Sequence, residues 1–436
     1  MAVARRVALA LLVTNLVVWA AWAALRVGGG QTAAACALDN GLRGYQPPAT
    51  EMSQTFARAG FNQLFPGDSN FALPALDSGS RTSQKSVPGY IPPVLLESIA
   101  VVESKWHQAY TDPGTVGPLT VAFDCGYGVM QVTSGMISPE GQSGTPSTYQ
   151  LLAGLHYAYN VAAGAALLAG KWNLMPSYLP VIGTGDPHVA EDWYFAVWAY
   201  NGFVMRNHPD SPDLPYPRPP YDCRSNYYVP GTQRLYPYSE LVWGCTNNPP
   251  VDAQGRPWFT PALQPAGKLT LPPHGSISPD VVALFSQGAQ TAKQDLLALQ
   301  PSHTDTTPAP GGSFPATHGQ PQLQVSTRSM NVGPVGQDRD FPLVLTNGGR
   351  GLDAYLVVSN TPWIDVSPAM GVVTGADLGG APATVTLTIH GAELPQGGAV
   401  GSVTVYSPLS ASQGVQVTVT ALRAMVTGAN GVTRGQ

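Results

Sequence analysis

The segment from Ile91 to Trp106 constrains the fold most strongly, because it places a carboxylate among apolar side chains. Two prolines near its start suit the first turn of a helix, where a missing N–H costs nothing, and no Gly or Pro follows within it. At about 100° per residue, one apolar stripe forms along the predicted helix from Leu95, Ile99, Val102 and Trp106. Glu103 falls inside this stripe, whereas Glu97 is predicted to project from the opposite face as a solvated charge.

A carboxyl group held against apolar neighbours has its charged form disfavoured and its pKa raised. A raised pKa suits a general acid that works near neutral pH, so Glu103 is the first candidate for a catalytic residue. The alternative is a buried glutamate that pairs with an Arg or Lys elsewhere in the fold, since glutamate is almost never fully buried without a partner. The helix alone leaves both interpretations open.

The composition allows several domains and argues against nucleic acid as a partner. The 436 residues are enough for two or three domains, each with its own core. Only 11% of the residues are charged, against roughly 25% in ordinary soluble proteins, while Gly (48) and Pro (42) are abundant, so part of the chain is expected to be loop and linker. A formal net charge of -5 provides no basic surface for a nucleic acid.

Residues 1–26 carry the pattern of an export signal. Arg5 and Arg6 precede a long apolar run, which is typical of a signal peptide or a signal anchor, and the sequence leaves the two open. The small residues Ala33 to Ala35 resemble a cleavage site. We therefore expect an extracellular or cell-envelope protein that contacts the membrane only through this segment, if the segment is not cleaved.

The four cysteines are expected to form disulfides, as in other exported chains. Cys223 and Cys245 flank one Pro- and Tyr-rich loop and form the natural pair, which leaves Cys36 with Cys125. The sequence has no CxxC or HExxH spacing, and its histidines are spread out. We expect neither a metal nor another cofactor.

Along the chain, composition and periodicity divide the remainder into four parts. Residues 27–90 are predicted to be a tether that wraps the next domain and includes a short helix near Met52 to Ala59. Residues 91–262 contain further helical patterns at Tyr149 to Trp172 and His188 to Phe203, then a Pro- and Tyr-rich stretch from 206 that wraps this domain or lines a groove. Residues 263–324 are predicted to be a flexible linker with one helix, at Pro279 to Leu299. Residues 325–425 show six or seven short alternating strands, which predict a β-sandwich.

Four motifs in the helical region occur in a fixed order. They are Glu103-Ser104, Gly128-Val129-Met130-Gln131, Asn160-Val161-Ala162-Ala163-Gly164 and Ala199-Tyr200-Asn201-Gly202. With these motifs the segment from about 91 to 203 resembles the catalytic domain of soluble lytic transglycosylases, within the lysozyme-like superfamily. Val129 stands where that family usually has leucine, and the family's alanine between Asn201 and Gly202 is missing. The C-terminal part similarly resembles the Ig-like modules of secreted bacterial proteins.

The resemblance implies a multidomain chain with a mainly α lysozyme-like catalytic domain and a C-terminal all-β Ig-like sandwich. Glu103 matches the sole catalytic acid/base of the family. The expected substrate-binding residues, some of which line the cleft in relatives, are Ser104, Gly128, Met130, Gln131, Asn160, Tyr200 and Asn201.

The expected function is cleavage of the β-1,4 bond between N-acetylmuramic acid and N-acetylglucosamine in peptidoglycan glycan strands. Most glycosidases use two carboxylates. No second acid stands out here, since Asp112 lies in a loop and Glu191 and Asp192 open a helix. A single carboxylate suits the lytic route, in which the sugar's own 6-hydroxyl attacks and leaves a 1,6-anhydro end. The alternatives are lysozyme-type hydrolysis by the same acid and a non-catalytic wall-binding protein on a degenerate domain.

Overall fold

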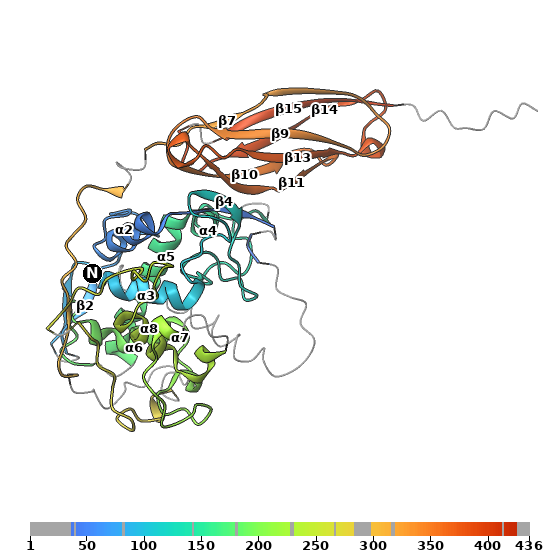
Figure 1. Cartoon of the computed structure of the whole chain (residues 1–436). Helices are drawn as coiled ribbons and strands as arrows, with labels where there is room; N and C mark the ends of the chain where they lie inside the picture. The colour runs from blue at the N-terminus through green and yellow to red at the C-terminus, as the bar shows by residue number, and fades with distance from the viewer. Residues whose placement is uncertain are drawn as a thin grey trace, which may run out of the picture. The chain divides into compact units, whose positions relative to one another are not determined.

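The computed structural model describes residues 36–38, 41–80, 83–141, 144–178, 182–226, 231–265, 267–282, 298–314, 319–411 and 414–424. Within these residues the protein combines a helical part with a β-sandwich (Figure 1). The prediction of a multidomain chain with helical and all-β parts is confirmed at this level. The predicted export segment lies outside the described residues.

The helical part contains seven α-helices among the described residues. They are α2 (Ala49–Gly60), α3 (Pro93–Ser104), α4 (Thr148–Leu155), α5 (Tyr157–Tyr178), α6 (Tyr194–Tyr200), α7 (Cys223–Asn226) and α8 (Tyr238–Asn247). Three antiparallel strand pairs accompany them: β1 (Arg43–Gln46) with β4 (Thr115–Pro118), β2 (Leu76–Ser78) with β3 (Lys85–Val87), and β5 (Leu263–Gln264) with β6 (Thr304–Asp305). The predicted helices near Met52 to Ala59 and before Asn201 are confirmed, the latter as the 3₁₀ turn η2 (Ala190–Trp193) followed by α6.

Helix α3 lies at the centre of the helical part, between α2 and α8 (Figure 1). Pro92 and Pro93 begin it as predicted, and Val94 N–H donates to Asp305 Oδ2 at 3.2 Å, so the cap comes from a distant segment. At its other end Lys105 and Trp106 both have positive φ, which turns the chain back until the Trp106 indole N–H donates to the Glu97 carbonyl.

The amphipathic interpretation of α3 is wrong, because both faces of the helix are packed. Every residue from Pro93 to Val101 is buried, Glu97 included. Glu97 is only 6% exposed, and its Oε1 accepts a hydrogen bond from Ser53 Oγ of α2 at 2.7 Å. Burial raises the pKa of Glu97 to about 8, so this group is a buried neutral acid near pH 7 and not a solvated charge.

The helical pattern predicted from Tyr149 to Trp172 is two helices and not one. α4 ends before His156, and α5 leaves at an angle of 106°. The carbonyls that would continue α4 are occupied by side chains, because Ala153 O accepts from Asn160 and Gly154 O accepts from Gln108. Periodicity could not reveal this break, since both sides of it are apolar.

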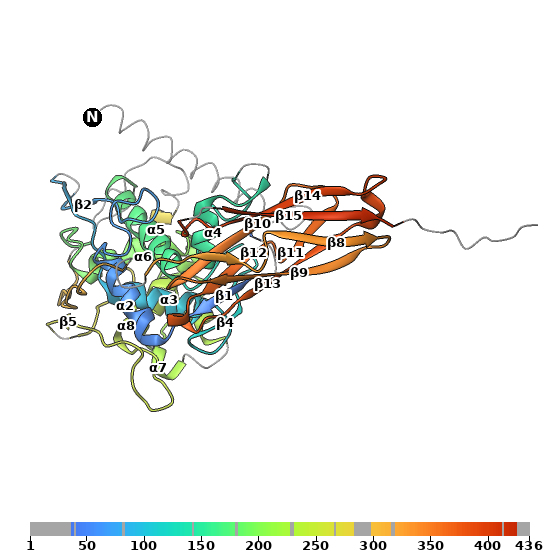
Figure 2. The same ribbon diagram turned by 90° about the horizontal axis from the view of Figure 1, so that it is seen from above.

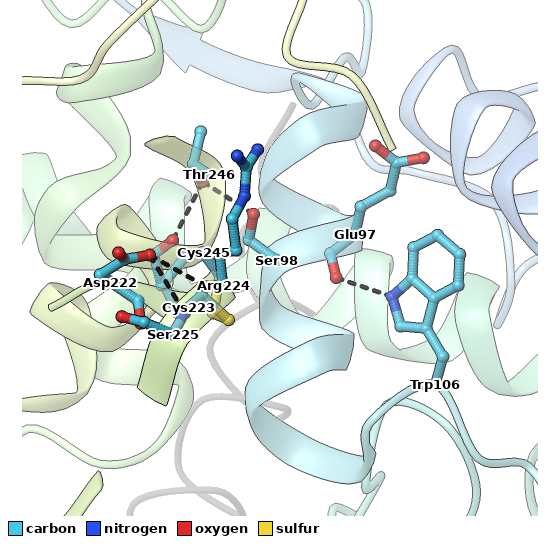
Figure 3. The surroundings of a disulfide bond; sticks show 10 residues. Glu97, Ser98, Trp106, Asp222, Cys223, Arg224, Ser225, Cys245 and Thr246 are labelled. Atoms are coloured by element: carbon cyan, nitrogen blue, oxygen red, sulfur yellow. Dashed lines mark hydrogen bonds between the residues drawn. A yellow bond between two sulfur atoms is a disulfide. The ribbon is translucent and has the colours of Figure 1, made fainter. Parts of the chain in front are cut away.

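Helices α3 and α8 are antiparallel neighbours, because Ser98 of α3 lies beside Thr246 near the end of α8 (Figure 3), whereas Glu103 lies beside Tyr238 at its start. The hydroxyl of Ser98, in the middle of α3, lies 2.8 Å from that of Thr246, near the C-terminal end of α8. Cys245 near the end of α8 is joined to Cys223 of α7, and the predicted pairing is confirmed. The second bridge joins Cys36 to Cys125, also as expected. Two disulfides are typical of proteins that fold in an oxidising, extracellular environment.

Residues 263–324 are predicted as a flexible or semi-extended linker, but several residues that the structure describes between 263 and 314 pack into the helical core. This stretch contributes buried side chains to the helical core, namely Leu263, Leu269, Ile277, Val281 and Phe314. Farther along, Arg58 of α2 donates to the carbonyls of Gly311 and Gly312 at 2.9 and 2.6 Å. The helix predicted at Pro279 to Leu299 falls mostly outside the described residues.

Within 319–411 and 414–424, nine strands form two sheets (Figure 2). One sheet has the order β12-β10-β14-β15-β8 and the other β11-β13-β9-β7. The strands are β7 (Leu323–Val325), β8 (Ser329–Val335), β9 (Arg339–Asn347), β10 (Leu352–Ser359), β11 (Ile364–Ser367), β12 (Met370–Thr374), β13 (Ala383–Ile389), β14 (Ala399–Tyr406) and β15 (Gly414–Arg423).

The β-sandwich prediction is confirmed, with more strands than the six or seven expected. Buried residues alternate along β9, β13 and β15, and side chains from both sheets form one core. The chain is interrupted between β7 and β8, where Thr327 Oγ1 bonds both the N–H and the carbonyl of Ser329. β7 therefore pairs with β9, whereas β8 pairs in parallel with β15.

No single helix among the described residues is both long and apolar enough to cross a bilayer, although the bent pair α4 and α5 together meet the criteria of length and composition.

Replacing Glu97 with Gln should change how stability depends on pH. The pKa of Glu97 is about 8 in the folded protein against the ordinary 4.5, so the folded state holds this proton more tightly. The native protein therefore loses stability as pH rises through this interval, and Glu97→Gln does not. Chemical denaturation measures the free energy of unfolding of both proteins. The value for the variant minus that for the native protein should increase by on the order of a few kcal/mol between about pH 5 and pH 8. A difference that stays constant with pH would contradict the burial of an uncharged acid.

Candidate functional site

The four motifs meet at the turn Gly128–Gln131, which is closed by a hydrogen bond from Gln131 N to Gly128 O. The Gly128 N–H donates to the backbone carbonyl of Thr120, and side chains from separate elements bond further backbone groups of the turn. Ser104 Oγ donates to Val129 O at 2.7 Å, and Tyr200 Oη donates to Met130 O at 2.8 Å. Met130 N–H donates to Asn160 Oδ1 at 2.8 Å. Sequence segments nearly 100 residues apart thus converge on one turn.

Gly128 is required here for two physical reasons. Its φ is +68°, and a Cβ at this position would lie 2.4 Å from Gln108 Oε1 and 2.7 Å from Asn160 Nδ2. Gln131 also has positive φ, and its side chain folds back so that Nε2 donates to Gly128 O at 2.7 Å. The predicted Gly128 and Gln131 are therefore brought to the site, with Gln131 partly exposed.

Three of the predicted substrate-binding residues lie beneath the turn and not at its surface. Asn160 and Met130 are fully buried, and Ser104 is 6% exposed. Asn160 Nδ2 also donates to Tyr127 O at 2.7 Å, so this amide shapes the turn. A Cβ on Gly164 would lie 2.6 Å from Met130 Cβ, which explains the glycine of that motif. These side chains position the site in this structure and do not present polar atoms to a ligand.

Glu103 extends from the last turn of α3 and is partly buried. Its Oε1 accepts a hydrogen bond from the Tyr238 hydroxyl at the start of α8. Burial raises the pKa of Glu103 to about 7, the Tyr238 hydrogen bond opposes that rise, the Asp124 carboxylate adds to it, and a hydrogen bond from Asn201 opposes it. The group can therefore both hold and release a proton near neutral pH.

Tyr200 and Asn201 come from the C-terminal end of α6, and the structure brings both to Glu103. Burial, followed by the nearby Glu103, raises the pKa of Tyr200 well above its usual value, so its hydroxyl stays protonated. Asn201 is exposed beside the carboxyl, where its side chain acts as a donor. Gly202, with φ of +109°, lets the chain leave the helix at this point.

Sequence reasoning missed Tyr238 and Asp124. Tyr238 lies in the Pro- and Tyr-rich stretch that was expected to wrap the domain or line a groove, and nothing in its local sequence distinguishes it from the other tyrosines there. Asp124 adjoins Cys125, so the disulfide to Cys36 was the available signal that its position is fixed. The acids weighed from sequence are placed elsewhere: Asp112 is exposed, and Glu191 is fully buried against His303.

The turn from Ala122 to Cys125 borders the site and presents an aromatic side chain to solvent. Cys125 N–H donates to Ala122 O at 3.1 Å, which closes the turn, and the disulfide to Cys36 anchors it. A Cβ on Gly126 would lie 3.1 Å from Gln131 Oε1 and 3.4 Å from Asp124 Oδ1, so both side chains lie next to this glycine. Phe123 in this turn is 98% exposed.

Among the described residues, no group of three or more His, Cys, Asp or Glu side chains is arranged to hold a metal ion.

Comparison with known proteins identifies no family. No family model matches the chain, and no curated protein matches it. Solved structures similar to parts of it include a Bacteroides ovatus GH5 xyloglucanase (14% identity, 24% of this chain and 19% of that one, TM-score 0.18). Another is the E. coli chaperone DraB (10% identity, 24% of this chain and 57% of that one, TM-score 0.20). A third is a PapD-like domain of human CEP192 (12% identity, 27% of this chain and 94% of that one, TM-score 0.20). The chain spans less than two thirds of the first two proteins. TM-scores this low carry no argument about the fold or the activity of this chain.

Replacing Tyr238 with Phe should raise the pKa of Glu103 by roughly one unit, because it removes a donor that favours the carboxylate. Carbon-13 NMR of glutamate-labelled protein measures this titration, with Glu103→Gln identifying the signal. Tyr236→Phe is the matched control, because Tyr236 lies two residues before Tyr238, is also buried and packs edge-on against Tyr221. An unchanged Glu103 titration in Tyr238→Phe would show that this hydrogen bond does not matter.

Proposed function

We propose that the protein is an exported lytic transglycosylase that cleaves the β-1,4 bond between N-acetylmuramic acid and N-acetylglucosamine in peptidoglycan. The helical part would be a mainly α lysozyme-like catalytic domain, and the sandwich an Ig-like accessory module. The observation that carries the proposal is Glu103, a partly exposed carboxyl with a pKa of about 7, held where the four motifs meet.

In the proposed reaction Glu103 supplies and then recovers one proton. The protonated carboxyl donates to the glycosidic oxygen as the bond from that oxygen to the anomeric carbon breaks. The 6-hydroxyl of the muramic acid then attacks the anomeric carbon and gives its proton to the Glu103 carboxylate. One C–O bond forms for the one that breaks, and the acid is restored without water.

The donors around Glu103 fit both halves of this cycle. Tyr238 and Asn201 stabilise the carboxylate that exists after the first proton transfer. Burial opposes them and keeps the pKa of Glu103 near 7, so the acid form is available at the start. Because the acid must be protonated, activity should fall as pH rises through about 7.

Lysozyme-type hydrolysis is a second candidate, and Asp124 is the observation that favours it. Its carboxylate lies close enough to raise the pKa of Glu103, so the site holds a second acid that sequence reasoning did not find. Most glycosidases that hydrolyse their substrate use two carboxyl groups as catalytic residues. In that mechanism water, and not the 6-hydroxyl, supplies the oxygen that joins the anomeric carbon. The product then has a reducing end and not a 1,6-anhydro end.

Glu103→Gln should reduce the rate of glycan cleavage by at least about 10² to 10⁴, since it keeps the shape of the side chain and removes the transferable proton. Zymography on wall-impregnated gel and a soluble glycan assay measure the loss. Glu97→Gln, assayed near pH 6, is the control on the same helix, because Glu97 is then uncharged and Gln can still accept from Ser53. A folded Glu103→Gln protein that remains active would end the proposal, and inactivity of the native protein would favour the non-catalytic wall-binding alternative.

The products of the native enzyme should be one water lighter than hydrolysis products, because the 6-hydroxyl closes the anhydro ring. Mass spectrometry of the released fragments separates the two reactions. Full-mass reducing ends would assign the protein to lysozyme-type hydrolysis. In that case Asp124→Asn should abolish most of the activity, whereas for the lytic reaction it should chiefly lower the pKa of Glu103.

Phe123→Ala should weaken binding of the glycan and leave the chemical step nearly intact. An exposed aromatic ring can stack on the apolar face of a sugar, and losing such a contact should raise KM about threefold to tenfold, equivalent to roughly 0.5–1.5 kcal/mol. Steady-state kinetics on soluble glycan fragments measure KM and kcat separately. Tyr216→Ala, which removes another exposed aromatic, is the control. Equal KM values for native protein and Phe123→Ala would remove Phe123 from the binding surface.

A further inference from the structure

Asn207 connects the two residues that donate hydrogen bonds to Glu103. It ends the 3₁₀ turn η3 (Met205–Asn207), between α6 and α8, and is 7% exposed. Its Nδ2 donates to Asn201 Oδ1 at 3.2 Å and to Gly202 O at 3.1 Å. Its Oδ1 accepts from Tyr238 N–H at 3.3 Å. None of the four motifs includes this residue.

The first of these contacts fixes which way the Asn201 amide points. An asparagine side chain has an oxygen that only accepts and a nitrogen that only donates. Because the Asn207 Nδ2 group can only donate, it holds Asn201 Oδ1 toward itself. The Asn201 nitrogen is then the atom left to face Glu103, where a donor is needed.

The second contact supplies a cap for α8. The first backbone N–H groups of a helix have no acceptor within the helix, and the residue before α8, Pro237, provides no side-chain cap. Asn207 Oδ1 accepts from the first of them, that of Tyr238. This bond fixes the residue whose hydroxyl reaches Glu103.

We propose that Asn207 is a positioning residue that sets the hydrogen-bond donors of Glu103, by orienting the Asn201 amide and by anchoring Tyr238. It acts on the catalytic group through these two side chains and does not touch the reacting atoms. Its part in catalysis rests on the proposed function, whereas its effect on Glu103 does not.

The groups that face Glu103 come from three elements. They are Tyr238 of α8, Tyr200 and Asn201 of α6, and Asp124 of the disulfide-anchored turn. Among the residues that the structure describes, Tyr238 and Asn201 are the two that donate to the carboxyl, and Asn207 contacts both. A substitution at Asn207 should therefore weaken the hydrogen bonds that Tyr238 and Asn201 donate to Glu103.

The decisive variant is Asn207→Asp. Asp still accepts from Tyr238 N–H and is a favoured helix cap, so α8 should be retained. Its carboxylate cannot donate to Asn201 Oδ1, so the Asn201 amide should turn over and present its oxygen to Glu103. The pKa of Glu103 should then rise by roughly one unit or more, read by carbon-13 NMR of glutamate-labelled protein with Glu103→Gln as reference.

A double-mutant cycle separates this effect from the added charge. In an Asn201→Ala background, Asn207→Asp should move the Glu103 titration by clearly less than in the native background. Asn247→Asp is the matched control, since Asn247 bonds the backbone of Leu269 at the far end of α8 and should leave Glu103 unchanged. An equal shift with and without Asn201, or no shift at all, would overturn the inference.

A second variant covers the case in which Asn207→Asp does not fold. Asn207→Ser keeps a hydroxyl cap for α8 but is too short to hold Asn201, so it should raise the pKa of Glu103 no further than Asn201→Ala does. No rise with Asn207→Ser would overturn the inference. These titrations need no substrate. If the pKa of Glu103 shifts but the native protein cleaves no glycan, the inference about Asn207 stands and the proposed function is wrong. If the native protein cleaves glycan but the pKa does not shift, the proposed function stands and the inference is wrong.

Discussion

The arrangement of the helical part depends on the turn Gly128–Gln131, whose peptide groups have almost no secondary-structure partners. Buried peptide groups must be hydrogen-bonded, so side chains supply the bonds: Ser104 from α3, Asn160 from α5 and Tyr200 from α6. Each of these contacts fixes one helix relative to the turn. The same requirement bends the chain between α4 and α5, because Asn160 also takes a carbonyl that would have continued α4.

Around this framework the environment of Glu103 is a balance of opposing effects. Burial favours the neutral acid, whereas the donors Tyr238 and Asn201 favour the carboxylate. The pKa of Glu97, on the same helix, rises further, because Ser53 opposes burial there and the Asp305 charge adds to the rise; this carboxyl is also not exposed to a ligand. Two glutamates of one helix thus differ in accessibility and in the number of donors around them.

Segments far beyond the motifs complete the site. The start of α8 provides Tyr238, and α8 is fixed by the Cys223–Cys245 disulfide, by the buried pair Arg218 and Glu240, and by its contact with α3. Asp305, from a stretch whose composition suggested a free linker, caps α3 itself. Helix α3 is therefore held at its beginning and at its end by residues that follow it by more than 130 positions.

The sequence by itself determined the extent of α3, the acid among apolar neighbours, the pairing of Cys223 with Cys245 across one loop and the alternation of the sandwich strands, because these depend on local periodicity, proline positions and cysteine spacing. Only the tertiary structure decided that Glu97 is buried, that Asn160 and Met130 lie beneath the turn, that residues 263–282 pack on the helices, and that Tyr238 and Asp124 act on Glu103. Burial and hydrogen-bond partners depend on which distant segments cover a residue. A periodic pattern records only that a face is apolar, and it cannot specify what packs against that face.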